Sequence, residues 1–558
     1  MHATSTLAPT PDPRRTHCRT RRRHTRLRLA ASTLALAGLH ATAWAAGMPP
    51  GKIVAMSLPQ LRAALDSGAL SAEDLVGAYL ARIEAGDRRD QGPHAVIEIN
   101  PHAMAQAKAW DAGRGQRGAV QPGAALGGIP FLAKDNYDAA GMPTTGGSLA
   151  LRTSAPATNA FVIQRLLDQG AILLGKTNLS ELAASYGWYG YSSVGGQTLN
   201  PYNPLRTADG SSSGSAAAVA AGYAPFALGT DTTGSIRAPA SVTATVGMRT
   251  TLGLVSRSGI IPMSLTSDVA GVITRTVDDQ AIVLDAIQGE DKDDGATVDV
   301  PRSPGRLSAG LAGAVLAGKS IGVVDNFDGG SADVDEVKRK AVAAMERAGA
   351  RIVHIRLPAD YATLQPDLLG PIGLAEFRPQ FEAYLARLPV GQPRDLPSFL
   401  RVLDGLTGQG TTVINPGRYK GLVENLETHT TDSPAYIRML SVVIPALKGR
   451  LLALMDQGGY DALVFPTLAC TAPVVPGKAD PTFVCKTYAY AAGKISSATG
   501  FPEITVNGGW APGNMPVGIS FLGRPGDDAK VLALAAAFER SDAGASARRQ
   551  RERKADQE

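Results

Sequence analysis

The chain has 558 residues and a formal net charge of +5, from 55 Lys and Arg residues against 50 Asp and Glu residues. Eight of the basic residues and one of the acidic residues lie in residues 1–45, so residues 46–558 carry 47 basic and 49 acidic side chains. This balance excludes a large basic surface for a nucleic-acid backbone, and we predict no nucleic-acid partner.

Residues 1–45 have the pattern of a signal peptide. A basic stretch that ends at Arg28 is followed by an apolar run over residues 29–39 and by a small-residue cleavage pattern over residues 43–45. The apolar run is too short to span a bilayer. We therefore predict an exported protein, periplasmic or extracellular, with no stable membrane anchor. The Sec and twin-arginine routes both stay open.

The next elements alternate between helix and strand. Residues 57–87 are typical of two amphipathic helices, the second capped by Ser71 with Asp74 three positions later. A helix is also expected over residues 160–169. Strands are expected over residues 95–99, 129–133, 171–174 and 226–229. This order predicts an α/β fold, a large mixed β-sheet core sandwiched by helices.

Residues 330–460 are richer in helix, notably over 334–347, and strands are expected at 320–324 and 351–355. No repeat or long linker divides the chain. We predict a single domain over residues 46–540, in which residues 330–460 form a helical insertion that shapes the pocket. The charged, Ala-rich residues 541–558 are expected to be a disordered tail, and the protein to be a monomer or homodimer.

Two loops rich in Ser and Gly enclose a helix and a strand between residues 209 and 240. In the second loop, several main-chain N–H groups are expected to point toward one anion-stabilising pocket at a helix start, beside a serine hydroxyl. These N–H groups belong to Thr232, Thr233, Gly234 and Ser235. The arrangement suits a serine that attacks an acyl group.

Such a serine needs a base, and histidine is scarce here. Outside residues 1–45 the histidines are His94, His102, His354 and His429. None lies in or beside the two loops, whereas Lys134 ends the apolar run 128–133. Burial favours the neutral form of a lysine, provided that the neighbouring Asp135 points away. Asp231 and Arg237 are expected to form a supporting polar network.

Together these residues resemble the amidase signature family, over about residues 57–540. The resemblance implies a Ser-cisSer-Lys triad with Ser235 as nucleophile, Ser211 as a bridging serine beside a cis peptide bond and Lys134 as base. The family spacing of 24 residues favours Ser211 over its two neighbours. No cofactor and no metal are implied. Residues 95–101 and 195–202 are most similar to bacterial peptide amidases, which implies a peptide or small-molecule amide substrate.

Other functions also fit parts of the sequence. Residues 170–177 match the P-loop pattern, but four apolar strand residues in the middle make nucleotide binding unexpected. Residues 210–214 match the nucleophile elbow, which would make Ser212 the nucleophile of an exported Ser-His-Asp hydrolase. Further alternatives are a non-catalytic amide- or peptide-binding protein on the same scaffold, and part of an amidotransferase that acts on charged tRNA.

Two cysteines outside residues 1–45, Cys470 and Cys485, lie in a Pro-rich stretch. An oxidising compartment would let them pair, but the spacing alone leaves both a disulfide and two buried thiols open. Without clustered histidines they make no zinc site.

Overall fold

The computed structural model describes residues 49–113, 125–407, 413–427 and 430–555. The predicted signal peptide over residues 1–45 lies outside these ranges. Residues 50–558 group into one compact unit. The predictions for the α/β elements can therefore be compared within this unit.

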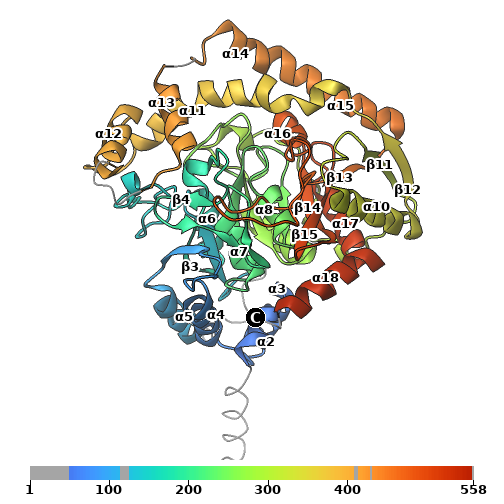
Figure 1. The fold of residues 1–558 in the computed structure, drawn as a ribbon. Coiled ribbons are helices and arrows are strands. Elements are labelled where there is room, and N and C mark those ends of the chain that lie inside the picture. Colours follow the sequence, from blue (N-terminus) through green and yellow to red (C-terminus); the bar gives the residue numbers. More distant parts are fainter. Residues whose placement is uncertain (1–48, 114–124, 408–412, 428–429, 556–558) are drawn as a thin grey trace, which may run out of the picture. The chain divides into compact units, whose positions relative to one another are not determined.

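One mixed sheet of 11 strands forms the core of the unit (Figure 1). In order across the sheet, the strands are β1 (Val96–Ile99), β3 (Ile172–Thr177), β2 (Pro130–Lys134), β8 (Phe226–Asp231), β10 (Val269–Thr274), β9 (Val246–Arg249), β14 (Glu503–Ala511), β15 (Met515–Leu522), β13 (Ala462–Pro466), β11 (Ser320–Val324) and β12 (Arg351–Ile355). Strand β2 is parallel to β3 and β8, and β11 is parallel to β12 and β13, while the other pairs are antiparallel. The predicted large mixed sheet is confirmed.

Helices flank this sheet. Those from the first two thirds of the chain are α2 (Pro50–Ala55), α3 (Leu58–Asp66), α4 (Ala72–Gly86), α5 (Ala103–Ala112), α6 (Phe161–Asp168), α7 (Ser213–Ala220), α8 (Arg237–Val242) and α9 (Val277–Ile287). The Ser71 hydroxyl accepts a 2.9 Å hydrogen bond from the Asp74 N–H, which is the predicted cap of α4. Two small hairpins, β4 (Tyr191–Ser192) with β5 (Gly196–Gln197) and β6 (Leu199–Asn200) with β7 (Asn203–Thr207), lie outside the main sheet.

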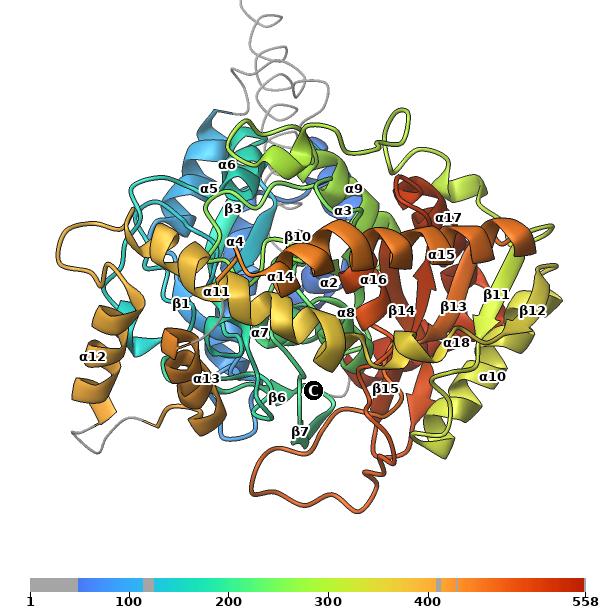
Figure 2. The same cartoon turned by 90° about the horizontal axis from the view of Figure 1, so that it is seen from above.

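The region predicted to be a helical insertion contains α10 (Ala332–Arg347), α11 (Gly370–Leu385), α12 (Leu396–Thr407), α13 (Pro416–Glu427), α14 (Pro434–Arg438) and α15 (Ile444–Gly458). Figures 1 and 2 both show α11 running beside α14 and α15. Phe377 and Phe381 of α11 pack with Phe399 of α12 in an apolar cluster that includes Leu182 and Ile261. Burial of these side chains fixes α11 against the loops of the sheet.

The predicted disordered tail has to be corrected, because α18 (Asp542–Ala555) occupies most of it. The helix packs on β14, where the Trp510 indole donates a 3.2 Å hydrogen bond to the carbonyl of Ala547. Ala547 itself is buried. One small apolar contact face is enough to order a helix whose other residues are charged, and composition alone does not reveal it.

Two further expectations concern single segments. Strand β3 covers the middle of the P-loop pattern, and its residues are buried on both faces, so they form no phosphate-binding loop. Within the described ranges, no helix combines the length and apolar character needed to cross a membrane.

Candidate active site

Lys134 lies at the carboxyl end of β2, beside the parallel strand β8. Its Nζ lies 2.8 Å from Ser211 Oγ, 3.1 Å from Ser212 Oγ and 2.8 Å from Thr230 Oγ1. The side chain is fully buried, and this burial lowers the pKa of Lys134 to about 7. A buried amine close to neutrality, surrounded by hydroxyl groups, is suited to accept a proton.

Asp135, the next residue, faces another cation. Its carboxylate pairs with Lys176 at 2.9 Å and accepts hydrogen bonds from the N–H and hydroxyl of Thr145. Side chains alternate between the faces of a strand, which separates Asp135 from Lys134. The expectation that Asp135 points away from Lys134 therefore agrees with these contacts.

The two serine loops meet at Lys134. The Gly210–Ser211 peptide bond is cis, and α7 begins two residues later. The Ser212 N–H donates a 3.1 Å hydrogen bond to the carbonyl of Ser235, which joins the two loops directly. Residues 24 apart in sequence thus come together because β8 returns the chain to the same edge of the sheet.

Asp231 at the end of β8 shapes the second loop. Its carboxylate accepts hydrogen bonds from the N–H groups of Gly234 at 2.8 Å and Ile236 at 3.1 Å, and pairs with Arg237 at 2.9 Å. Burial alone would raise the pKa of Asp231, but Arg237 and the hydrogen bonds hold it well below its usual range. The Gly234 N–H is therefore occupied, so Thr232, Thr233 and Ser235 remain as candidate oxyanion donors.

Arg237 extends this network beyond the two residues that the sequence indicates. It also pairs with Glu503, whose carboxylate accepts a 2.7 Å hydrogen bond from Ser520, and Arg249 reaches Asp231 at 3.3 Å. All four charged side chains are fully buried. Glu503 directly follows the Gly500-Phe501-Pro502 motif, which was the available signal.

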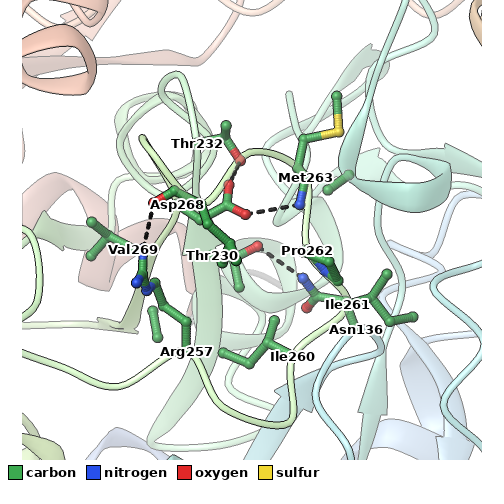
Figure 3. Close-up of a pocket in the computed structure, with 13 residues that line it drawn as sticks. Asn136, Thr230, Thr232, Arg257, Ile260, Ile261, Pro262, Met263, Asp268 and Val269 are labelled. Carbon is green, nitrogen blue, oxygen red and sulfur yellow. Dashed lines mark hydrogen bonds between the residues drawn. The ribbon is translucent and has the colours of Figure 1, made fainter. Parts of the chain in front are cut away.

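Hydrogen bonds also fix the side of the site shown in Figure 3. Asp268 accepts a 2.6 Å hydrogen bond from Thr232 and a 2.8 Å bond from the Met263 N–H, and Asn136 donates to Thr230 at 3.1 Å (Figure 3). Thr232 and Thr230 flank Asp231 in sequence. These contacts hold the loop that follows β8 from its second side.

A cavity of about 520 Å³ opens beside Ser235. Residues of the second loop line one wall, and Leu374 and Phe377 of α11 line another. An aromatic wall is formed by Tyr186, Tyr189, Tyr488 and Tyr490. The cavity is large enough for a drug-sized or short peptide ligand and is mostly apolar with a few polar groups.

Tyr490 and Lys494 connect this cavity to both loops, and nothing in the sequence pattern singles them out. The Tyr490 hydroxyl donates a 2.9 Å hydrogen bond to Asp209, whose other oxygen accepts from the Gly210 N–H at 2.6 Å. Burial raises the pKa of Asp209 to about 7. Lys494 Nζ donates to the carbonyl of Thr233. Only the order of strands in space brings these residues together.

The nucleophile-elbow alternative finds no support in the contacts of Ser212. Its hydroxyl donates to the Thr230 carbonyl at 3.1 Å and accepts from Lys134. The ring nitrogens of His94 and His354 contact Arg89 and Asp325 instead, and His429 lies outside the described residues. Strand β7 precedes this loop, but it belongs to a hairpin apart from the main sheet.

Cys470 and Cys485 are joined by a disulfide with an S–S distance of 2.02 Å. The segment that follows carries Tyr488 and Tyr490 into the cavity wall. In the part of the chain that the structure describes, no three His, Cys, Asp or Glu side chains gather as they would around a metal ion.

Comparison with known proteins agrees with this geometry. The Amidase family model matches residues 74–532. The native peptide amidase from Stenotrophomonas maltophilia has a similar solved structure, with a TM-score of 0.77 and 36% identity over 87% of this chain and 96% of that chain. The A chain of the glutamyl-tRNA(Gln) amidotransferase from Cupriavidus metallidurans is 32% identical over 87% of this chain and 96% of its own length. Its counterpart from Myxococcus xanthus is 33% identical over 87% of this chain and 97% of its own length.

These relatives contradict the prediction of an exported, periplasmic or extracellular protein. The amidotransferase chains that match 87% of this chain are named for glutamyl-tRNA(Gln), a substrate found inside cells. The prediction depended entirely on residues 1–45, which lie outside the described residues. A basic stretch followed by a short apolar run is a compositional pattern, and it does not by itself establish export.

Proposed function

This chain belongs to the amidase signature family and is an amidase acting on C–N bonds, and from this premise we propose that it hydrolyses carboxamides through Ser235, Ser211 and Lys134. The observation that carries the proposal is the 2.8 Å contact between Lys134 Nζ and Ser211 Oγ in a fully buried site. Family membership also disfavours the alternative of a non-catalytic binding protein.

In the proposed reaction, neutral Lys134 takes the proton of Ser211 as Ser211 takes the proton of Ser235. The Ser235 oxygen attacks the amide carbonyl, and the N–H groups of its loop stabilise the oxyanion. The proton then returns along the same path to the departing ammonia or amine as the C–N bond breaks. Water repeats the sequence on the acyl-enzyme, which releases the acid and restores Ser235.

The lowered pKa makes this base available. A lysine with an ordinary pKa near 10.4 is neutral about once in 2,500 molecules at pH 7, a cost of roughly 4 to 5 kcal/mol. With a pKa of about 7, half of Lys134 is neutral at that pH. Burial thus removes most of the cost before the substrate arrives.

We propose that the substrates include C-terminal amides of peptides. The similarity to peptide amidase at 36% identity and the cavity of about 520 Å³ beside Ser235 both support this class. The test is ammonia release from a panel of peptide amides, anilides and short aliphatic amides. Preference for short aliphatic amides over peptide amides would reject the peptide class.

We also propose that the protein acts as a monomer or homodimer, without nucleic acid. The balance of 47 basic and 49 acidic side chains over residues 46–558 supports this, whereas the similarity to amidotransferase chains favours a complex with glutamyl-tRNA(Gln). Purified chain that releases ammonia from peptide amides without tRNA or added partner proteins would support hydrolysis alone. Activity that needs both additions would favour the amidotransferase function.

The triad is tested by substitution. Ser235→Ala and Lys134→Ala are each expected to abolish amide hydrolysis while the fold is retained. Ser212→Ala is expected to keep measurable activity, because Ser211 and Thr230 still contact Lys134. A serine-directed fluorophosphonate should label Ser235. Labelling of Ser212 instead, with full activity in Ser235→Ala, would reject the proposed triad.

A further inference from the structure

One peptide group of the second loop is held at both ends by buried charges. The carbonyl of Thr233 accepts a hydrogen bond from Lys494 Nζ, and the N–H of the same peptide group, on Gly234, donates to Asp231 at 2.8 Å. Lys494 is 6% exposed, and Asp231 is fully buried. A cation on the oxygen side and an anion on the hydrogen side match the dipole of the peptide group.

This peptide group has reason to need restraint. Gly234 has a φ of +124°, which only glycine adopts without strain, so its own side chain offers no barrier to rotation. If the peptide group turned over, its carbonyl oxygen would face Asp231 and its N–H would face Lys494. Both contacts would be repulsive in a site shielded from water, where charges act strongly.

The cation is fixed in place through the same network. Arg237 pairs with Asp231 and also donates a 2.9 Å hydrogen bond to the carbonyl of Gly493, the residue before Lys494. The contacts therefore form a closed ring from Asp231 through Arg237 and Lys494 to the Thr233–Gly234 peptide group. Lys494 also lines the cavity, with Nζ 5.8 Å from the centre of the Tyr490 ring.

We propose that Lys494 is a positioning residue for hydrolysis, which locks the orientation of the Thr233–Gly234 peptide group and through it the N–H and hydroxyl of Ser235. This inference rests on the proposed role of Ser235 as nucleophile. Burial and then Arg237 lower the pKa of Lys494 to about 8, so the amine is mostly charged at pH 7 and can act as the donor. Lys134 and Lys494 thus have separate functions, one as proton acceptor and one as fixed charge.

Lys494→Met tests the proposal, because it keeps the length of the side chain and removes the charge. We expect kcat to fall about ten- to a hundredfold, since a misplaced oxyanion loop loses transition-state contacts, while KM stays within about twofold. The rate of fluorophosphonate labelling at Ser235 should fall in parallel. Lys494→Arg, which keeps charge and donors, should recover part of kcat. Lys478→Met, at an exposed lysine of the preceding segment, is the matched control and should behave as the unmodified protein.

Unchanged kcat and labelling rate in folded Lys494→Met would overturn the proposal, as would an effect confined to KM. If Lys494→Met does not fold, Lys494→Gln decides, because its amide keeps a donor without the charge. Full kcat in Lys494→Gln would contradict the electrostatic lock, and a tenfold or larger loss would support it. Failure of the proposed triad gives a different result, since Ser235→Ala would then retain hydrolysis whatever Lys494 does.

Discussion

The amine of Lys134 decides when the site is active. Burial lowers its pKa to about 7, against the opposing effect of Asp231 and Asp268. The neutral form accepts the proton, so activity should rise with pH through about 7 and level off above 8. At pH 6 about one tenth of the lysine is neutral, so kcat/KM should be roughly tenfold below its plateau. A profile measured from pH 5 to 9 checks this, and a flat profile would exclude lysine as the base.

Thr230 should tune this base. Its hydroxyl oxygen accepts a 2.8 Å hydrogen bond from Lys134 and a 3.1 Å bond from Asn136. Thr230→Val removes the acceptor at nearly constant volume, so we expect kcat to fall about tenfold, equivalent to about 1.4 kcal/mol. The pH midpoint should also move down, because the charged lysine loses a partner. A loss of activity with an unmoved midpoint would show that Thr230 acts only on loop geometry.

At this scale, the sequence indicates some site residues and hides others. Lys134 can be singled out because it ends an apolar run and histidines are absent nearby. Thr230, Glu503 and Lys494 cannot, because each belongs to a different segment and gains its function from contacts across strands. The Gly234 N–H shows the same limit, since its acceptor is a side chain three residues earlier rather than a substrate.

Among the elements, β8 and β14 are joined by the ion pair between Arg237, which begins α8, and Glu503, which begins β14. Glu503→Gln keeps the shape and removes the charge, which leaves Arg237 with Asp231 as its one carboxylate partner within the described residues. We expect the free energy of unfolding to fall by about 3 kcal/mol, the lower range for breaking a buried pair. Urea denaturation followed by tryptophan fluorescence measures this. Glu346→Gln, on the exposed face of α10, is the control, and equal stability losses in the two variants would contradict the role of the pair.

Helix α18 makes a second prediction at the scale of elements. Removal of residues 541–558 takes away the Ala547 carbonyl that accepts from the Trp510 indole, and it uncovers β14. It also removes Arg551, whose guanidinium donates to the carbonyls of Arg275 and Ala244. The thermal midpoint should therefore fall, whereas a chain ending at residue 555 should melt as the full chain does. A midpoint unchanged by the longer deletion would restore the view of this segment as a dispensable tail.

Elements differ in how far sequence predicts them. The buried strands can be placed within about two residues, because apolar runs bounded by polar residues give a strong local signal. The α18 helix cannot be predicted in this way, since its charged composition conceals the narrow face that meets β14. Local signals fail where tertiary contact supplies the stability.

For the whole molecule, the order of strands matters more than their identity. The α/β class follows from the alternation of patterns, but nothing local predicts that β14 lies between β9 and β15, or that β2 lies beside β8. These neighbours bring Lys134, the two serine loops and Glu503 to one region. The same arrangement places α11 over the cavity, so specificity depends on a helix more than a hundred residues from Ser235 in sequence.

That helix offers the sharpest test of substrate size. Gly373 of α11 lines the cavity, and a side chain added there would meet no heavy atom within 4 Å. Gly373→Leu should therefore fold, with a gain in helix propensity of up to about 1 kcal/mol. The leucine would occupy part of the cavity of about 520 Å³. We expect kcat/KM for a bulky peptide amide to fall at least about tenfold through KM, while a short aliphatic amide is hydrolysed as before.

Gly449→Leu is the matched control, because Gly449 is also a helical glycine with open space around it and lies on the exposed side of α15, away from the residues that line the cavity. The ratio of kcat/KM for the two amides should change in Gly373→Leu and stay constant in Gly449→Leu. If both variants lowered the two activities equally, stability rather than cavity size would be responsible. If neither changed the ratio, the acyl part of the substrate would have to lie against another wall, which would shift attention from α11 to the aromatic wall at Tyr488 and Tyr490.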